Sequence, residues 1–383
     1  MLSVDDSHPG WRVASDKVDL FITENGGHMA PVTFDVDTDK SIQPYYISPW
    51  QNEDLTDFAD PVLAPLRGDF FCMPFGGNAE EVDGEQHSGH GEAASARWQR
   101  VDESTNAGIT TLTLQLPTTV RKGKITKKIH LRDGQNAVYT THTLEGYSGR
   151  MPIGHHCTLA VPEEESSLRV AVSDFELGMT PPCTFSNPAN AEYQSLAIGA
   201  RFTDLTKVPV MWKDAAPADC SRFPQRPGFT DLLQLLKKPS ATPAWTVAVC
   251  PSRGYLWFSL KEAAILPGTV FWISNKGRYG SPWNGRNRCL GLEETCSHFA
   301  DGLSASITPN DITDAGFPTA IQLSADNPTA VNFIQGAAGI PPDFDGVTDV
   351  TFGDETVTFI SETGSSVVVN VNHSFLKNST FDD

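Results

Sequence analysis

The chain has 383 residues, with 47 acidic and 28 basic side chains and a formal net charge of −19 at pH 7. A surface with this charge repels nucleic acids and anionic membranes, which excludes both as expected partners. The N-terminal stretch MLSVDDSHPGWRVASDKV has no basic region followed by an apolar run, and no later stretch is apolar over the length that crosses a bilayer. We therefore expect a soluble, cytoplasmic protein.

The sequence predicts a β-rich protein from Val18 onward. Short runs of alternating or β-branched residues are separated by Gly, Pro, Asn and Asp, which is the pattern of strands and turns. The clearest predicted strands are VDLFIT at Val18, GITTLTLQL at Gly108, KITKKIHLR at Lys124, AVYTTHTLE at Ala137, WTVAVC at Trp245, YLWFSLK at Tyr255, TVFWIS at Thr269, and the closing pair VTFIS and VVVNVN. One stretch, DLLQLLKK from Asp231, has a helical pattern for more than a turn.

These strands follow one another without the helices that a parallel sheet requires, so we expect a large antiparallel β-sandwich. The proline-rich interval APADCSRFPQRPG, residues 216–228, could be a linker between two domains. Strands of the same kind continue on both sides of it, which favours a surface excursion. We therefore predict that residues 1–383 form a single domain.

The seven cysteines are scattered through mostly apolar, strand-like stretches, which is typical of reduced core thiols. The sequence contains no CxxC pair and no zinc-ligand spacing. His87 and His90 have an H-x-x-H spacing in a glycine-rich loop, but no matching ligand pattern follows downstream. We therefore expect no metal site.

Arg67 and His90 lie in two segments that could contact a ligand. Arg67 precedes the aromatic pair Phe70-Phe71 in PLRGDFFCMPFGGN, whose glycines would let the backbone approach a ligand closely. An ordinary surface arginine before a core strand is the alternative. His90 lies in the small-residue loop EQHSGHGEAASARW, and loops on a rigid sandwich are where binding groups concentrate.

Two neighbouring histidines, His155 and His156, occur in RMPIGHHCTLAVPEE. In an extended strand successive side chains point to opposite faces. His155 would share an apolar face with Ile153, and His156 a small, polar face with Thr158. The pattern predicts that His155 is a core histidine and that His156 is open to a substrate, where histidine is suited to exchange a proton near neutral pH.

Glu293 ends the short apolar strand in RNRCLGLEETCSH. Alternation puts Leu290 and Leu292 on a core face, and Glu293 beside Gly291 on a face that leaves room for a ligand. A solvated carboxylate at a strand end is the alternative. The polar loop before this strand contains Trp283, which could stack on a sugar ring or anchor the core.

Together these segments resemble the galactose mutarotase-like superfamily, the aldose 1-epimerases and their hexose-phosphate relatives. HGEAASARW is similar to the family's HG segment, PIGHHCTL to its P-x-G-x-H strand, and CLGLEE to the late strand that ends in the catalytic glutamate. RGDFFCMPFG resembles the arginine-glycine to Pro-Phe-Gly stretch of the hexose-phosphate branch. No one motif is specific, but the four occur in the family's order in an all-β chain of the expected size.

The resemblance implies an isomerase, an aldose 1-epimerase that interconverts the α and β anomers of a sugar without a cofactor. Glu293 would be the general base that takes the proton from the anomeric hydroxyl, and His156 the general acid that protonates the ring oxygen. His90 and Arg67 would hold the sugar hydroxyls and the ring oxygen. We expect His156 to face Glu293 across the cleft with a pyranose ring between them, in a monomer or homodimer.

The sequence departs from the family pattern at three places. Glu294 stands where proline usually follows the catalytic glutamate, so either carboxylate could be the base. His155 stands where many members have an aromatic residue, so either histidine could be the acid. The acidic residue that contacts the sugar in mid-chain in several members has no match.

The sequence is also compatible with three other functions. A hexose-6-phosphate 1-epimerase would need two or more basic groups near Arg67, and Arg286 or Arg288 could supply one. A non-catalytic carbohydrate-binding protein could keep Trp283 and Arg67 without an acid and base that face each other. A polysaccharide lyase or glycoside hydrolase usually has a large additional helical domain, for which the sequence has no pattern.

Overall fold

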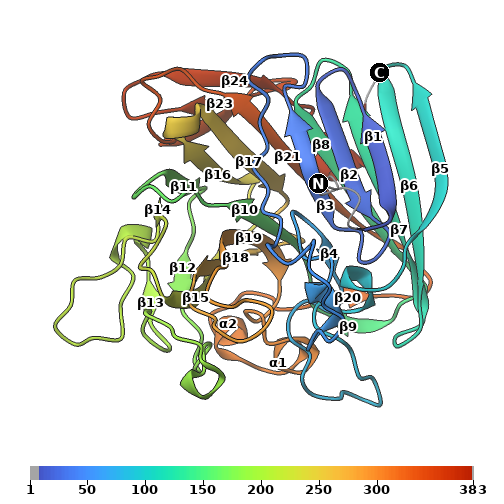
Figure 1. Ribbon diagram of the computed structural model, residues 1–383. Helices are drawn as coiled ribbons and strands as arrows, with labels where there is room; N and C mark the ends of the chain where they lie inside the picture. Colours follow the sequence, from blue (N-terminus) through green and yellow to red (C-terminus); the bar gives the residue numbers. More distant parts are fainter. Residues whose placement is uncertain (1–7, 382–383) are drawn as a thin grey trace.

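The computed structural model describes residues 8–381, and most of its regular structure is β-strand (Figure 1). Two large antiparallel sheets form the body of the protein, one of seven strands and one of nine. The all-β fold predicted from the sequence is confirmed, whereas a single domain over residues 1–383 stays a prediction.

The seven-stranded sheet runs, in spatial order, through β13 (Arg201–Phe202), β12 (Leu177–Met179), β15 (Phe229–Leu236), β18 (Gly268–Asn275), β19 (Arg288–Cys296), β10 (Ile153–Ala160) and β4 (Phe71–Cys72). The nine-stranded sheet runs through β14 (Arg222–Phe223), β11 (Leu168–Val172), β16 (Ala244–Cys250), β17 (Tyr255–Lys261), β21 (Thr329–Gly339), β8 (Ala137–Glu145), β7 (Gly123–Arg132), β6 (Ile109–Thr118) and β5 (Gln99–Asn106).

Three small sheets and several short helices complete the described chain. The sheets consist of β1 (Gly10–Ala14), β2 (Val18–Thr23) and β3 (Met29–Phe34); of β9 (Gly149–Met151) and β20 (Ile321–Leu323); and of β22 (Asp349–Phe352), β23 (Thr356–Ile360) and β24 (Ser366–Asn370). The helices are α1 (Leu303–Ile307), α2 (Asp311–Asp314), α3 (Phe375–Asn378) and the 3₁₀ turns η2 (Pro61–Leu63), η3 (Glu92–Ala94), η4 (Pro188–Asn190), η5 (Leu205–Lys207) and η6 (Pro251–Arg253). In residues 8–381 no helix combines the length and the apolar composition that crossing a membrane requires.

The main core lies between the two large sheets, where Leu144 and Phe333 of the nine-stranded sheet join a cluster with Phe271 and Leu292 of the seven-stranded sheet. The other face of the nine-stranded sheet is covered by the C-terminal strands β22 to β24, at the top left of Figure 1. Both faces of the sheet are therefore buried at β16 and β17, which explains why these strands are apolar at almost every position, whereas β5 at the edge of the sheet is exposed.

The segment DLLQLLKK, predicted to be helical, instead forms strand β15 through its first six residues, 231–236, and β15 pairs with β18 along its whole length. Leu233 and Leu235 face the core between the sheets, while Leu232 and Leu236 pack in a second cluster on the outer face. Leucines on both faces of a strand remove the period-two alternation and leave a pattern that looks helical. The prediction was wrong because burial on both faces overrode the local signal.

The proline-rich interval of residues 216–228 contains the short strand β14 and buries Cys220 and Phe223, so it is anchored to the core rather than lying wholly on the surface. All seven cysteines are free thiols, and all but Cys183 are buried. This agrees with the expectation of reduced core thiols.

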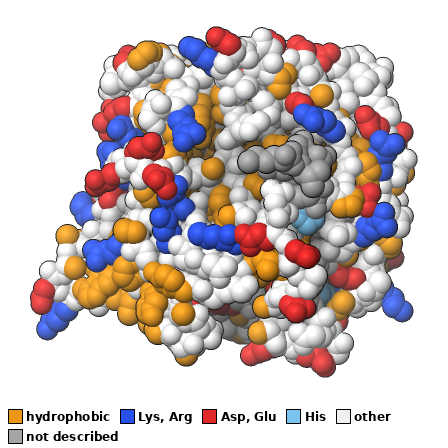
Figure 2. Space-filling view, viewed as in Figure 1, with side chains coloured by type: hydrophobic (Ala, Val, Ile, Leu, Met, Phe, Trp, Pro, Cys, Tyr) orange, Lys and Arg blue, Asp and Glu red, His pale blue; other side chains and the backbone are white. Residues whose placement is uncertain are grey.

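Acidic and basic side chains are interspersed over the visible face of the molecule (Figure 2). The excess negative charge is therefore not gathered into one patch on this face. Apolar side chains gather at the lower left, over the segments around β13. Exposed large side chains from this part of the chain are Ile198, Met211 and Trp212.

Candidate active site

His156 and Glu293 lie directly opposite each other in the antiparallel pairing of β10 with β19. Their side chains point to the same face, and Nε2 of His156 lies 3.2 Å from Oε1 of Glu293. Both residues are buried. The sequence motifs therefore come together as a contacting pair, although not as two groups on opposite sides of a cleft.

The side-by-side arrangement corrects the expectation that a sugar ring separates the two groups. In a cyclic sugar the anomeric hydroxyl and the ring oxygen are bonded to the same carbon. A base and an acid that are direct neighbours can therefore reach both oxygens from one side. The observed geometry fits proton transfer at a hemiacetal better than the geometry expected from the sequence.

An apolar stack holds the imidazole of His156 in place. The Phe70 ring lies parallel to it at 4.5 Å, and His28 stacks on the far side of Phe70 at 3.9 Å. Nδ1 of His156 is hydrogen-bonded to the hydroxyl of Thr158 at 3.1 Å. Burial lowers the pKa of His156 well below its usual range, so the ring is neutral at physiological pH.

Glu293 is 1% exposed, and burial raises its pKa well above the usual range of a glutamate. Within residues 8–381, its Oε1 has no partner that meets hydrogen-bond geometry. Gly291 makes room for this carboxylate, because a Cβ atom at Gly291 would lie 2.4 Å from Oε1 of Glu293. The space predicted beside Glu293 is therefore occupied at Gly291 by the carboxylate itself, and Gly291 is not part of the described wall of the pocket that Glu293 lines.

The His156–Glu293 pair lines a cavity of about 120 Å³ with walls that are mainly apolar and aromatic. Trp283 is part of this wall, where its ring meets Trp50 and Trp272 edge to face. His90 also lines the cavity, with its ring 4.9 Å from that of His156. Burial lowers the pKa of His90 to about 4, so this histidine is neutral as well. We call this cavity the His156 pocket.

Arg67 lies elsewhere. Its side chain is fully buried beside the carbonyl of Ala30 and the amide of Gln51, and the described wall of the His156 pocket does not include it. The aromatic run after Arg67 does reach the pocket, through Phe70. The motif therefore lies next to the site, but the arginine itself points into the core.

The two alternative residues, His155 and Glu294, face the interior between the sheets. Nδ1 of His155 lies 3.0 Å from the carboxylate of Asp69. Glu294 accepts hydrogen bonds from the hydroxyls of three strand residues and forms an ion pair with the buried Lys261; the hydroxyl donors are Thr246 at 2.7 Å, Ser259 at 3.1 Å and Thr269 at 2.7 Å. Neither residue lines the His156 pocket. Alternation along β10 and β19 thus separates the pocket residues from their sequence neighbours.

Arg278 was not predicted from the sequence. It lies in the loop between β18 and β19 and lines the His156 pocket. Its guanidinium carbon is 5.0 Å from the centre of the Trp283 ring and 5.8 Å from that of Trp272. One pattern that could have drawn attention to it is a basic residue in a loop with an aromatic residue, since a guanidinium packs favourably against aromatic faces.

Arg286 and Arg288, considered as phosphate ligands, lie outside the described pocket wall. Arg286 forms an ion pair with Glu53. Arg288 is 2.8 Å from Glu163 and donates to the carbonyl of Val161. Within residues 8–381 no group of three or more His, Cys, Asp or Glu side chains could hold a metal ion.

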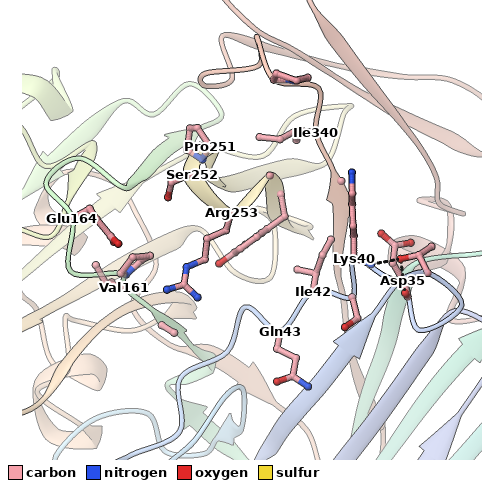
Figure 3. A pocket seen from close by; sticks show the side chains of 18 of the residues that line it. Asp35, Lys40, Ile42, Gln43, Val161, Glu164, Pro251, Ser252, Arg253 and Ile340 are labelled. Carbon is pink, nitrogen blue, oxygen red and sulfur yellow. Dashed lines mark hydrogen bonds between the residues drawn. The ribbon is translucent and has the colours of Figure 1, made fainter.

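A larger cavity of about 1450 Å³ lies near the end of β10 and the start of β19 (Figure 3). Its lining mixes acidic, basic and proline residues, and the side chain of Arg253 extends into it toward Val161. Neither His156 nor Glu293 reaches it, and its described wall contains no histidine. This cavity is the larger of the two, but the His156 pocket is the better candidate for an active site because it contains an acid–base pair.

No protein-family model and no curated protein matches the sequence. Solved structures do match the fold. A galactose mutarotase-like protein from Clostridium acetobutylicum has a TM-score of 0.58 at 12% identity, and the match covers 87% of this chain and 96% of that one. A galactose mutarotase related enzyme from Lactobacillus acidophilus has a TM-score of 0.54 at 10% identity, with 86% and 98% of the two chains covered.

The Slr1438 protein from Synechocystis sp. PCC 6803 also matches, with a TM-score of 0.54 at 12% identity over 87% of this chain and 96% of that one. At these identities the likeness concerns the fold alone. The chain has the galactose mutarotase-like fold, as the sequence motifs predicted.

Proposed function

We propose that the protein is an aldose 1-epimerase that interconverts the α and β anomers of an uncharged sugar. The observation that carries this proposal is the contact between His156 and Glu293 at the wall of a pocket. An imidazolium can donate a proton and a carboxylate can accept one. Hemiacetal opening needs both transfers at oxygens that share one carbon atom.

In the proposed reaction, the one proton that the buried pair shares moves onto His156, so that an imidazolium faces the ionised carboxylate of Glu293. The carboxylate takes the proton from the anomeric hydroxyl, while the imidazolium donates its Nε2 proton to the ring oxygen and becomes a neutral imidazole. The bond between C1 and the ring oxygen breaks, and the open-chain aldehyde forms. Rotation about the C1–C2 bond presents the other face of the carbonyl. The hydroxyl then attacks C1, its proton returns to His156, and Glu293 gives its proton to the new anomeric oxygen.

The burial of the pair supports these roles. Exclusion of water strengthens interactions with charge that develops during ring opening. The raised pKa of Glu293 makes the carboxylate a stronger base once it has lost its proton, and the lowered pKa of His156 makes the imidazolium formed on reclosure a stronger acid. Each positioned proton transfer can contribute about 10² to 10⁴-fold in rate.

The walls of the His156 pocket favour a single sugar ring. Trp272 and Trp283 offer apolar surfaces of the kind that cover the C–H face of a pyranose. The cavity of about 120 Å³ is small compared with the sites that take larger ligands. A polysaccharide substrate, and with it a lyase or a glycoside hydrolase, is therefore disfavoured.

A hexose 6-phosphate is also disfavoured as the substrate. A phosphate dianion calls for two or more basic groups. Within residues 8–381, Arg278 is the single lysine or arginine in the pocket wall. The other arginines considered as phosphate ligands, Arg67, Arg286 and Arg288, make their contacts outside this wall. A non-catalytic carbohydrate-binding protein remains the second candidate, since the same walls would bind a sugar without turnover.

The test is a survey of anomer interconversion by polarimetry and NMR over a panel of neutral aldoses and hexose 6-phosphates. We expect at least one neutral aldose to equilibrate faster with the protein than with heat-denatured protein. If only hexose 6-phosphates equilibrate faster, the substrate is a sugar phosphate and not a neutral aldose. No acceleration on any sugar, together with measurable sugar binding, would leave the carbohydrate-binding function.

A further inference from the structure

Arg278 occupies one end of the His156 pocket. Its guanidinium carbon lies 5.4 Å from the centre of the Phe185 ring, in addition to its contacts with Trp272 and Trp283. Trp272 is in turn 5.8 Å from the ring of His156. A sugar with its anomeric carbon at His156 and Glu293 would extend past Trp272, so its far side would meet Arg278.

Glu192 balances the charge of Arg278 from behind. Nε of Arg278 lies 3.3 Å from Oε1 of Glu192, and the two residues are partners in an antiparallel bridge. Two backbone hydrogen bonds secure the bridge: Tyr193 donates to Gly277 at 3.1 Å, and Tyr279 donates to Ala191 at 3.1 Å. Glu192 itself is not part of the described pocket wall. The carboxylate therefore neutralises the guanidinium while leaving it open to the pocket.

The hydrogen-bonding capacity of Arg278 and Trp272 is not fully used by the part of the chain that the structure describes. The 3.3 Å approach to Glu192 does not have hydrogen-bond geometry, and within residues 8–381 Nε has no hydrogen-bond partner. The indole nitrogen of Trp272 is likewise buried without a partner in the described chain. A buried donor without a partner is costly, so a ligand hydroxyl oxygen that accepts from the Trp272 indole nitrogen would remove this cost.

We propose that the Arg278–Glu192 pair is a specificity device that selects uncharged aldoses over anionic ones, such as uronates and sugar phosphates. Arg278 donates hydrogen bonds to hydroxyl oxygens on the side of the sugar remote from C1. Glu192 cancels the positive charge that would otherwise attract a carboxylate or a phosphate. The inference rests on the proposed function, because it assumes that C1 binds at His156 and Glu293.

The decisive variant is Glu192→Gln, which keeps the shape of the side chain and removes its charge. The variant leaves the guanidinium uncompensated, and an unpaired cation at a partly buried site attracts an anionic ligand. The matched control is Glu145→Gln, which removes the acidic partner of Lys124 from an ion pair on the nine-stranded sheet at 3.0 Å. That pair is not part of the His156 pocket.

Binding is measured by the fluorescence of the tryptophans, two of which line the pocket, with glucose, galactose, glucuronate and glucose 6-phosphate as probes. We expect the wild-type protein to bind one of the neutral sugars more tightly than either anion. Glu192→Gln should raise the affinity for glucuronate relative to that neutral sugar by about tenfold, which corresponds to about 1.4 kcal/mol. Glu145→Gln should leave the ratio unchanged.

Arg278→Met provides the second test. It should weaken the binding of the neutral sugar, because the donors are lost, and it should abolish the gain for glucuronate when combined with Glu192→Gln. An unchanged ratio in a folded Glu192→Gln variant would overturn the inference, as would a wild-type preference for either anion. Anomer interconversion is measured on the same samples, so a protein that binds sugars selectively but does not accelerate their equilibration contradicts the proposed function and not the specificity device.

Discussion

Nε2 of His156 and Oε1 of Glu293 are 3.2 Å apart, on neighbouring strands of one sheet and facing one pocket. The register of β10 against β19 creates this relationship, because it places the two residues directly opposite each other. The adjacent pair in the same register, His155 and Glu294, points to the other face of the sheet. One antiparallel pairing therefore separates a candidate catalytic pair from a structural pair.

The first prediction distinguishes the two histidines. His156→Gln should reduce the rate of anomer interconversion by about 10² to 10⁴-fold, because the general acid is lost. His155→Gln should act mainly on stability, because it replaces the ring that pairs with the buried carboxylate of Asp69; about 1–3 kcal/mol of unfolding free energy is expected. Steady-state rates and urea unfolding of both variants check this. An inactive but fully stable His155→Gln protein would reverse the assignment.

The second prediction concerns the buried ion pair of Glu294 and Lys261, whose side chains are 1% and 3% exposed. Glu294→Gln should lower the unfolding free energy by about 3–5 kcal/mol, because it leaves Lys261 charged and unpaired in the core. Replacing both residues with apolar ones, as in Glu294→Leu with Lys261→Met, should recover part of this loss. Denaturant unfolding measures the difference. A Glu294→Gln protein of wild-type stability without activity would instead make Glu294 the base.

The third prediction is a loss of stability in acid. Burial lowers the pKa of His90 and His130 to about 4 and that of His142 well below its usual range. The unfolded chain takes up these protons near pH 6.5 and the folded chain does not, so the stability that these groups contribute is present above that pH and is lost as the pH falls toward their folded pKa values. Each such histidine changes the unfolding free energy by about 1.4 kcal/mol per pH unit within this window.

His142→Phe tests this most directly. Within residues 8–381 neither ring nitrogen of His142 has a hydrogen-bond partner, and the ring stacks on Phe71 at 4.0 Å. A phenyl ring of similar shape should keep the packing and reduce the loss of stability below pH 6.5. Urea unfolding of the wild-type and variant proteins between pH 5 and 7.5 gives the slope of unfolding free energy against pH for each. Equal slopes would mean that His142 takes up its proton without unfolding.

The fourth prediction concerns Glu293, whose effect on stability has the opposite pH dependence to that of the buried histidines. Its folded pKa is raised, so its contribution to stability is present below the pKa of an unfolded glutamate and is lost as the pH rises toward the folded value. Glu293→Gln should therefore be more stable than the wild type near neutral pH, by a margin that grows with pH until Glu293 is fully ionised in the folded protein. Wild-type activity should fall with pH over the same range, since the loss of the one proton that Glu293 and His156 share leaves no acid for the ring oxygen. A stability margin that does not change with pH would contradict the raised pKa.

The strand pattern of the sequence was enough to predict the all-β fold and to choose His156 over His155, because both depend on the period of two along an extended chain. The same rule placed Glu293 beside Gly291. It failed at Leu232 and Leu233, where leucines cover both faces of β15 and the alternation disappears. The alternation of apolar and polar residues indicates which face of a strand is buried. It becomes ambiguous when both faces of the strand are buried.

The remaining parts of the site depend on contacts between distant segments. Phe185, Arg278 and Trp283 converge on the His156 pocket from loops, and Glu192 meets Arg278 through an isolated bridge. No local period indicates such convergence. Arg67 illustrates the converse, since its motif reaches the pocket through Phe70 while the arginine turns into the core.

The central claim is that Glu293 is the base for anomer interconversion. Exchange NMR on the neutral sugar that the wild-type protein converts fastest, with wild-type and Glu293→Gln proteins at equal concentration, tests it most directly. We predict that Glu293→Gln is folded, still binds the sugar, and exchanges its anomers about 10² to 10⁴-fold more slowly than the wild type. A folded Glu293→Gln protein that exchanges the anomers at the wild-type rate would contradict the claim.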